Sequence, residues 1–300
     1  YGLVGSEMCI RDRGKAEAIR HYGDLYDFQV VKDGDKLSLG KRELTFVTLP
    51  MLHWPDSMAT YCADDGILFS NDAFGQHYAA AKRFDDEVDL GILFYEAKKY
   101  FANILWPYAK LIDKALAKAA ALDLKMIATA HGIIWRSHIQ EIIAKYAAWG
   151  KGVSGSSVVI AYDTMWGATE QMARAVLEGV VSAGSDAVLL RMNETPNSTA
   201  VADLFEAGGM IIGSSTLNSG MLPTMGSLLV YLKGLNPTGK KAAVFGTYGW
   251  AGGAQKDMEA LLTAAGFELE PGVTCKWKAQ PEDLEAARQL GYEFARKLQK

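Results

Sequence analysis

Residues 158–173 read VVIAYDTMWGATEQMA and combine the sequence signals of a strand, a loop and a helix. An apolar run of strand length ends at Tyr162, and a short loop of hydroxyl residues with one glycine follows. Apolar residues then recur at the spacing of one helix face, at Met172, Ala175, Val176 and Val180. A strand, a loop and a helix in this order direct backbone N–H groups and a helix N-terminus towards a phosphate.

The loop itself indicates which phosphate fits. It has neither the Gly-Lys-Ser/Thr of a P-loop nor the G-x-G-x-x-G of a dinucleotide site. It offers Thr164 and Thr169 as neutral donors and contains no Lys or Arg, which suits the phosphate of flavin mononucleotide (FMN). Taken alone, an ordinary βα turn explains the loop equally well.

Two later segments favour the flavin site. Apolar strands at 209–213 and 242–245 end in loops of small, hydroxyl and aromatic residues. In an open parallel sheet, ligands lie beyond the carboxyl ends of the strands at the switch point, and aromatic rings offer planar faces for stacking. The predicted fold class is α/β, with a doubly wound parallel sheet. The candidate cofactor-binding residues are Thr164, Met165, Trp166, Gly167, Ala168, Thr169, Ser215, Thr216, Leu217, Asn218, Thr247, Tyr248, Gly249, Trp250, Ala251, Gly252 and Gly253.

Composition narrows the class of protein. A length of 300 residues favours about two domains. The net charge of -4 argues against a nucleic-acid partner, which requires a basic face. Three scattered cysteines are too few for a disulfide framework and fit a reducing, cytoplasmic setting. No apolar run reaches the roughly 18 residues of a membrane span, and no signal-peptide pattern is present.

The first residues are set apart. Residues 1–13, YGLVGSEMCIRDR, show no clear period and no initiator Met, and they resemble a stretch that recurs at the ends of unrelated metagenome-derived sequences. We interpret them as a sequencing artefact; a genuine frayed N-terminus is the alternative.

Residues 14–150 read as a second α/β unit. Strands are expected at 43–49, 58–63, 67–70 and 126–130, and Asp64-Asp65-Gly66 predicts a hairpin between the second and third of these. Helices are expected at 96–105, which Pro107 ends or kinks, at 109–121, and from Ser137, where Gln140 completes a capping-box pattern. Residues 150–157, rich in Gly and Ser, predict a linker to a second domain at 156–300.

Three residues of this unit are candidate metal ligands and catalytic residues. His53, Asp72 and His131 each follow a short apolar strand, and strand ends on one edge of a sheet converge. Two imidazoles and a carboxylate suit zinc or iron. Each residue alone is better explained as structural, but the shared placement favours metal. His77 fits a supporting position beside the metal and a surface position equally well.

These residues carry a family resemblance. TMWGAT at 164–169, STLN at 215–218 and YGWAGG at 248–253 resemble the flavodoxin-like half of flavodiiron proteins, although Ser215 stands where a proline is expected. LHWPDSM at 52–58, FSNDAFG at 69–75 and AHGIIWR at 130–136 resemble the later metal motifs of the family's β-lactamase-like αββα domain. The resemblance implies that His53 ligates one iron, Asp72 bridges both, and His131 ligates the other.

One motif of the family is absent. H-x-E-x-D-H occurs nowhere in the chain and belongs upstream of Lys15. We therefore expect residues 14–150 to be the C-terminal part of the diiron domain of an N-terminally truncated protein. The fragment alone is expected to be inactive and to hold no stable two-iron site.

The resemblance also implies an activity. Flavodiiron proteins pass electrons from a small donor, often rubredoxin, through FMN to two non-haem irons, which reduce oxygen to water or nitric oxide to nitrous oxide. A head-to-tail homodimer is expected from the same resemblance. The alternative is a flavodoxin-type electron carrier fused to a zinc metallo-hydrolase-like domain, which metal analysis would distinguish. The ligands do not rank oxygen against nitric oxide.

Overall fold

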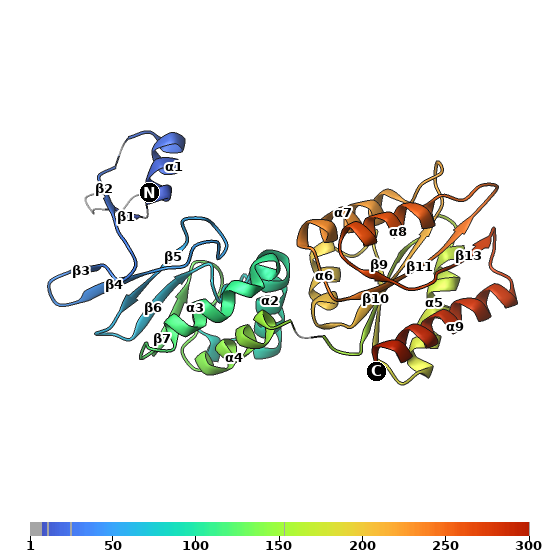
Figure 1. Ribbon diagram of the computed structural model, residues 1–300. Coiled ribbons are helices and arrows are strands. Elements are labelled where there is room, and N and C mark those ends of the chain that lie inside the picture. Colours follow the sequence, from blue (N-terminus) through green and yellow to red (C-terminus); the bar gives the residue numbers. More distant parts are fainter. Residues whose placement is uncertain (1–7, 11, 25, 153, 300) are drawn as a thin grey trace. The chain divides into compact units, whose positions relative to one another are not determined.

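A computed structural model describes residues 8–10, 12–24, 26–152 and 154–299. The chain divides into two compact units, Tyr1–Gly152 and Val153–Lys300, each with its own sheet and helices (Figure 1). Within those described ranges, none of the helices combines the length and apolar character that crossing a lipid bilayer demands.

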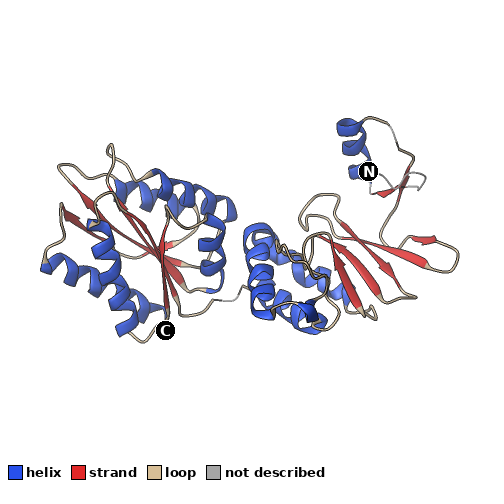
Figure 2. Cartoon of the chain, turned by 180° about the vertical axis from the view of Figure 1, so that it is seen from behind, coloured by secondary structure: helices blue, strands red, loops and turns tan. Residues whose placement is uncertain are grey.

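The first unit is built on a mixed sheet in the order β3-β4-β5-β6-β7. Its strands are β3 (Lys36–Ser38), β4 (Glu43–Thr48), β5 (Met58–Cys62), β6 (Ile67–Asn71) and β7 (Met126–Thr129). The helices α2 (Leu90–Tyr100), α3 (Ile112–Ala119) and α4 (Ile139–Gly150) group together beside this sheet (Figure 2). Short helical turns lie at η1 (Asp85–Glu87), η2 (Phe101–Leu105) and η3 (Trp106–Leu111).

The directions of the strands explain why His53, Asp72 and His131 lie at one edge of this sheet. β4 pairs antiparallel with β5, β5 pairs antiparallel with β6, and β6 pairs parallel with β7. The strands β4, β6 and β7 therefore all point the same way, and their carboxyl ends share one edge of the sheet. The hairpin predicted at residues 64–66 is the β5–β6 connection.

Two helix predictions in this unit need correction. α2 begins at Leu90 rather than residue 96, because the Asp89 side chain caps it by accepting a hydrogen bond from Ile92 N. The capping box predicted at Ser137 is wrong: α4 begins at Ile139 after His138, without a side-chain cap of its own. A distant carboxylate satisfies this helix start instead, as described below.

Within the described residues, the N-terminal segment forms a separate two-stranded sheet with one helix. β1 (Met8–Ile10) pairs parallel with β2 (Phe28–Val30), and α1 (Asp12–Tyr22) connects them. Residues 1–7 and 11 of the expected artefact lie outside the described residues. The artefact at 1–13 and the domain limits 14–150 and 156–300 stay predictions.

The second unit is a parallel sheet in the order β12-β11-β10-β8-β9, with β13 also paired to β11. Its strands are β8 (Val158–Asp163), β9 (Ala187–Arg191), β10 (Gly209–Ser215), β11 (Lys241–Tyr248), β12 (Glu268–Leu269) and β13 (Val273–Lys276). α5 (Ala168–Ser182) and α9 (Pro281–Leu298) cover one face, and α6 (Asn197–Glu206), α7 (Pro223–Leu235) and α8 (Ala254–Ala264) cover the other (Figure 1).

The three apolar runs of the sequence are the central strands of this sheet. Every residue of β8 and β10 is buried, as expected for parallel strands covered by helices on both faces. The core between the sheet and the α5–α9 layer includes Ile160, Val176, Phe245 and Phe294. Because the first strand lies inside the order, the sheet has its switch point between β8 and β10. The predicted α/β class with a doubly wound parallel sheet is confirmed.

Candidate functional site

His53, Asp72 and His131 converge at the shared edge of the first sheet. They follow β4, β6 and β7 respectively. His53 Nε2 lies 3.4 Å from Asp72 Oδ2, and His131 Nε2 lies 3.2 Å from Asp72 Oδ1. Each imidazole thus faces a different oxygen of one carboxylate. The Asp72 side chain is 13 % exposed, against 27 % for His53 and 48 % for His131.

These separations match those of neighbouring ligands on a metal ion. Two donor atoms about 2.1 Å from one ion, at angles of about 90–110°, lie roughly 3.0–3.4 Å apart. Among the residues that the structure describes, no three His, Cys, Asp or Glu side chains gather around a single point that could hold one ion. Each imidazole nitrogen faces its own oxygen of the Asp72 carboxylate at such a separation, so the three side chains offer two donor pairs of this kind.

Aromatic groups surround the outer imidazole. The Tyr100 ring centroid lies 6.0 Å from that of His131, and the His77 ring lies 5.8 Å from His131 and 4.9 Å from Tyr100. Burial and the nearby Asp72 carboxylate raise the pKa of Tyr100 well above its usual value, which keeps its hydroxyl protonated. The sequence left His77 open, and the structure brings it beside His131. Tyr100 was missed because it lies on a helix far from the strand-end motifs.

A buried amide joins the loops that carry Asp72 and His131. Gln76 is fully buried. Its Nε2 donates to Phe74 O at 2.8 Å and Ile133 O at 3.2 Å, and its Oε1 accepts from Ile133 N at 2.7 Å. Its backbone N donates to His131 O. Gly132 has φ 82°, and a Cβ there would overlap Gln76, so only glycine fits this approach.

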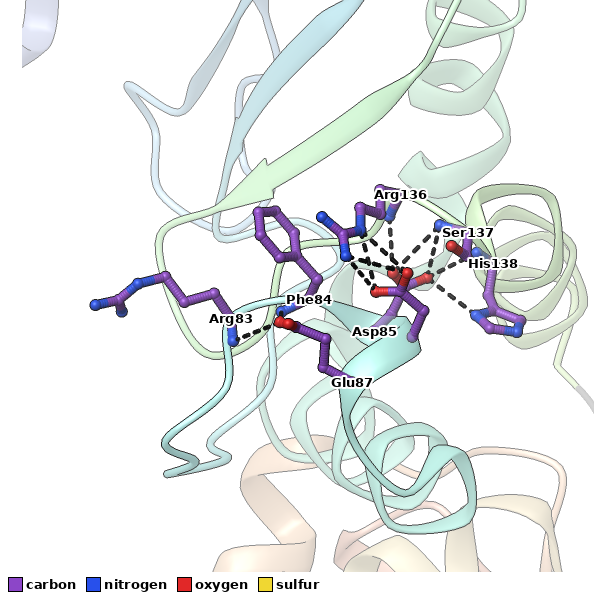
Figure 3. Close-up of polar contacts among 8 residues, drawn as sticks. Arg83, Phe84, Asp85, Glu87, Arg136, Ser137 and His138 are labelled. Atoms are coloured by element: carbon purple, nitrogen blue, oxygen red, sulfur yellow. Dashed lines mark hydrogen bonds and ion pairs between the residues drawn. The ribbon is translucent and has the colours of Figure 1, made fainter.

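The far end of the His131 loop is held by Asp85, whose side chain is fully buried. Its carboxylate accepts hydrogen bonds from the backbone N–H groups of Arg136, Ser137 and His138 and contacts His138 Nδ1 at 3.0 Å (Figure 3). Burial opposes ionisation, but these hydrogen bonds outweigh it and hold the pKa of Asp85 below its usual value. A tertiary contact therefore starts α4.

A cavity of about 710 Å³ lies at the carboxyl edge of the second sheet. This volume is within the range of small-molecule and cofactor sites. Of the predicted residues, Met165, Trp166, Ala168, Ser215, Thr216, Leu217, Asn218, Thr247, Tyr248, Gly249, Trp250 and Ala251 line it. Gly252 and Gly253 line a neighbouring cavity of about 260 Å³. Thr164, Gly167 and Thr169 line neither.

Thr169 instead belongs to a cluster of hydroxyls beneath the cavity. It is fully buried, and its Oγ1 lies 2.8 Å from Ser215 Oγ and 2.9 Å from Thr247 Oγ1. This hydroxyl cluster joins the first turn of α5 to the ends of β10 and β11. Thr164 accepts a hydrogen bond from Gly167 N and so shapes the loop between β8 and α5.

The N-terminus of α5 meets the conditions for an anion site. Gly167 at its N-cap has φ 82°, and the helix has no side-chain cap. The N–H groups of a first helical turn have no partner within the helix and carry the positive end of its dipole. Ala168, in that first turn, lines the cavity.

The cavity rim is aromatic. Trp166 is 91 % exposed, Trp250 85 % and Trp277 61 %. Gln171, Ser219, Trp277 and Lys278 also line the cavity and were missed in the sequence. Trp277 and Lys278 follow β13, whose sequence Val-Thr-Cys-Lys lacks the long apolar run that marks the central strands. Because β13 is a polar edge strand, the sequence did not indicate that the loop after it is a fourth strand-end loop at the cavity.

Comparisons with known protein families give one match for each unit of the chain. Residues 160–291 match the sequence profile described as Flavodoxin, and residues 7–132 match that described as ODP family beta lactamase. The second match begins inside the stretch 1–13, whose status as an artefact stays a prediction.

Curated relatives extend across both matches. A nitric oxide reductase of Moorella thermoacetica is 45 % identical over 283 residues, covering 93 % of this chain and 71 % of that protein. An anaerobic nitric oxide reductase flavorubredoxin of Escherichia coli is 38 % identical over 281 residues, covering 92 % of this chain and 59 % of that protein.

Solved structures show the same two-part fold. The flavodiiron protein from Giardia intestinalis has a TM-score of 0.93 at 35 % identity, covering 97 % of this chain and 73 % of that one. Rubredoxin:oxygen oxidoreductase from Desulfovibrio gigas also has a TM-score of 0.93 at 35 % identity, covering 98 % of this chain and 75 % of that one. This chain, with a β-lactamase-like unit followed by a flavodoxin-like unit, belongs to the flavodiiron protein family.

Proposed function

We propose that this chain is the electron-transferring and gas-reducing part of a flavodiiron reductase, which reduces oxygen to water, nitric oxide to nitrous oxide, or both. The observation that carries this proposal is the Asp72 carboxylate, which presents one oxygen to His53 and the other to His131. The names of the relatives, nitric oxide reductase and rubredoxin:oxygen oxidoreductase, support it.

The residues of the first unit fit two irons. Imidazole nitrogen and carboxylate oxygen are suitable donors for non-haem iron. His53 would hold one iron, His131 the other, and Asp72 would bridge them, offsetting the repulsion between two cations. When bound, the irons supply the reducing electrons to the gas. Tyr100 stays protonated near this edge, and Gln76 fixes the His131 loop against the Asp72 loop.

The residues of the second unit fit FMN. The uncapped start of α5 would hold the phosphate through backbone N–H groups, without a cation in the 164–169 loop. The Thr216–Ser219 and Tyr248–Ala251 loops would flank the ring, and the exposed tryptophans at the rim would exclude water from it. When bound, FMN takes up electrons from a donor and releases them singly.

Partners follow from this proposal. A small protein donor such as rubredoxin would reduce the flavin, and a head-to-tail homodimer would bring the flavin of one subunit to the irons of the other. We also assign the protein to the cytoplasm. The two cysteines whose side chains the structure describes, Cys62 and Cys275, are both free thiols and fit such a reducing setting.

Metal analysis tests the diiron assignment. The chain is joined to an upstream segment that carries the H-x-E-x-D-H motif, and iron per subunit is measured by elemental analysis. We expect two irons per subunit in the joined protein without a substitution. Asp72→Ala should lose both irons, and His53→Ala or His131→Ala should lose mainly one. Asp113→Ala, which removes an exposed carboxylate from α3, is the matched control and should keep both irons.

Gas consumption with reduced rubredoxin is measured in the same proteins. Activity should disappear with the iron in Asp72→Ala and persist in Asp113→Ala. Full iron content in Asp72→Ala would refute the bridging role. Two zinc ions with no gas consumption would favour the alternative of a metallo-hydrolase-like domain fused to an electron carrier.

A further inference from the structure

Trp277 holds an unusual position for a large side chain. It follows the end of β13 and has φ 61°, in the left-handed region that bulky residues rarely adopt. Its side chain is also 61 % exposed. The backbone conformation and the exposed ring are both unfavourable, and a glycine would relieve both costs.

The contacts of Trp277 direct it towards the cavity of the second unit. Its backbone N donates to Tyr248 O at 2.7 Å, which ties the end of β13 to the end of β11. The edge of its ring approaches Gly249, where a Cβ would lie 3.1 Å from Trp277 Cη2. Its ring centroid is 6.2 Å from that of Trp250. Trp277 therefore lines the cavity beside the loop that carries Tyr248 and Trp250.

We propose that Trp277 is a flavin-contacting residue that closes the outer side of the cavity against the ring of FMN. This inference rests on the proposed function and adds a fourth strand-end loop to the three recognised in the sequence. A planar side chain at this place stacks on or abuts a planar ligand and removes its own apolar surface from water. Ligand contact thus offsets the exposure that the free protein tolerates.

The test measures FMN affinity and FMN-free stability in the same variants of the full chain. Trp277→Gly removes the ring and relaxes the left-handed backbone, and Trp277→Phe keeps a ring. The matched control is Asn236→Gly, which replaces a residue with φ 52° at the end of α7, outside the residues that line the cavity. FMN is titrated into flavin-free protein by fluorescence, and thermal unfolding is followed without FMN.

We expect Trp277→Gly to weaken FMN binding at least tenfold, Trp277→Phe at most threefold, and Asn236→Gly not at all. Without FMN, Trp277→Gly should unfold at a temperature no lower than that of the natural chain. A purely structural role for the ring predicts the opposite pair of results, a lower unfolding temperature with unchanged affinity.

Three outcomes would overturn the inference. In the first, Trp277→Gly binds FMN within twofold of the natural chain, which leaves the proposed function standing. In the second, the affinity loss comes with a clearly lower unfolding temperature of the FMN-free variant, or Asn236→Gly shows the same loss. In the third, the folded natural chain binds no FMN, and the proposed function fails with the inference.

Discussion

Gln76 shows how a single buried side chain can determine the geometry of a site that it does not enter. Its side-chain amide donates hydrogen bonds to the carbonyl oxygens of Phe74 and Ile133 and accepts one from the backbone N–H of Ile133. These hydrogen bonds join two loops in the way that backbone pairing joins two strands. Buried polar groups left without partners are costly. The separation of Asp72 from His131 therefore depends on a residue outside the ligand set.

We expect Gln76→Met, which keeps the volume and removes the hydrogen bonds, to lower the free energy of unfolding of the first unit by about 2–5 kcal/mol. The imidazole signals of the five histidines resolve the effect by NMR. The His131 signal should shift, while that of His21 should not. Tyr61→Phe, which removes a 2.9 Å hydrogen bond to Asp123 O in the same unit, is the control. It should destabilise the unit and leave the His131 signal in place; an unmoved His131 signal in Gln76→Met would contradict the positioning role.

At the scale of elements, α4 shows a helix start set by a residue about fifty positions away. The sequence Ser137-x-x-Gln140 predicts a local capping box. In the structure, the Asp85 carboxylate accepts hydrogen bonds from the backbone N–H groups of Arg136, Ser137 and His138 instead. Arg136 also lies over the Phe84 ring (Figure 3). Its guanidinium pairs with the carboxylate of Asp86. Tertiary hydrogen bonds to a charged acceptor outweigh the weaker local cap.

Asp85→Asn tests this helix start through pH. Because the folded-state pKa of Asp85 lies below its ordinary value of 3.8, the ionised group stabilises the fold fully above that value and loses its contribution as pH falls through the folded-state pKa. At pH 7 the variant should be less stable by about 1.5–3 kcal/mol, since an amide N–H₂ then faces backbone donors. Urea unfolding from pH 7 down to pH 2.5 should show this difference shrinking; a difference independent of pH would argue against the carboxylate.

The strands of the second unit were predictable because parallel strands covered on both faces need long apolar runs. The convergence of His53, Asp72 and His131 was predictable because each follows a short apolar strand and these strand ends lie on one edge of the sheet. Trp277 was not, since β13 is a short strand with polar residues at alternate positions, Val273 to Lys276. Gln76, Tyr100 and Asp85 were not either, because their partners are set by tertiary packing rather than by spacing along the chain.

At the scale of the whole molecule, the chain is two compact units with separate sheets and cores. Units of this kind unfold as separate cooperative transitions. The proposed FMN site lies wholly within the second unit, and the Gln76 contacts lie wholly within the first.

We therefore expect two transitions in calorimetry. FMN at about 100 times its dissociation constant should raise only one of them, by about 2.7 kcal/mol of unfolding free energy, and Gln76→Met should lower only the other. Tyr61→Phe, which should destabilise the first unit without FMN, serves to identify the transition of that unit. A single transition that responds to both changes would show that the two units unfold together.

The uncapped start of α5 has a consequence for how flavin binding responds to ionic strength. A site that holds phosphate with lysines or arginines loses affinity as counterions screen those charges. The 164–169 loop contains neither, and the donors at the helix start are fixed dipoles close to the ligand. FMN affinity should consequently fall less steeply with rising salt than in a site that holds the phosphate with several lysines or arginines, and Lys278 in the cavity lining should contribute to the remaining dependence.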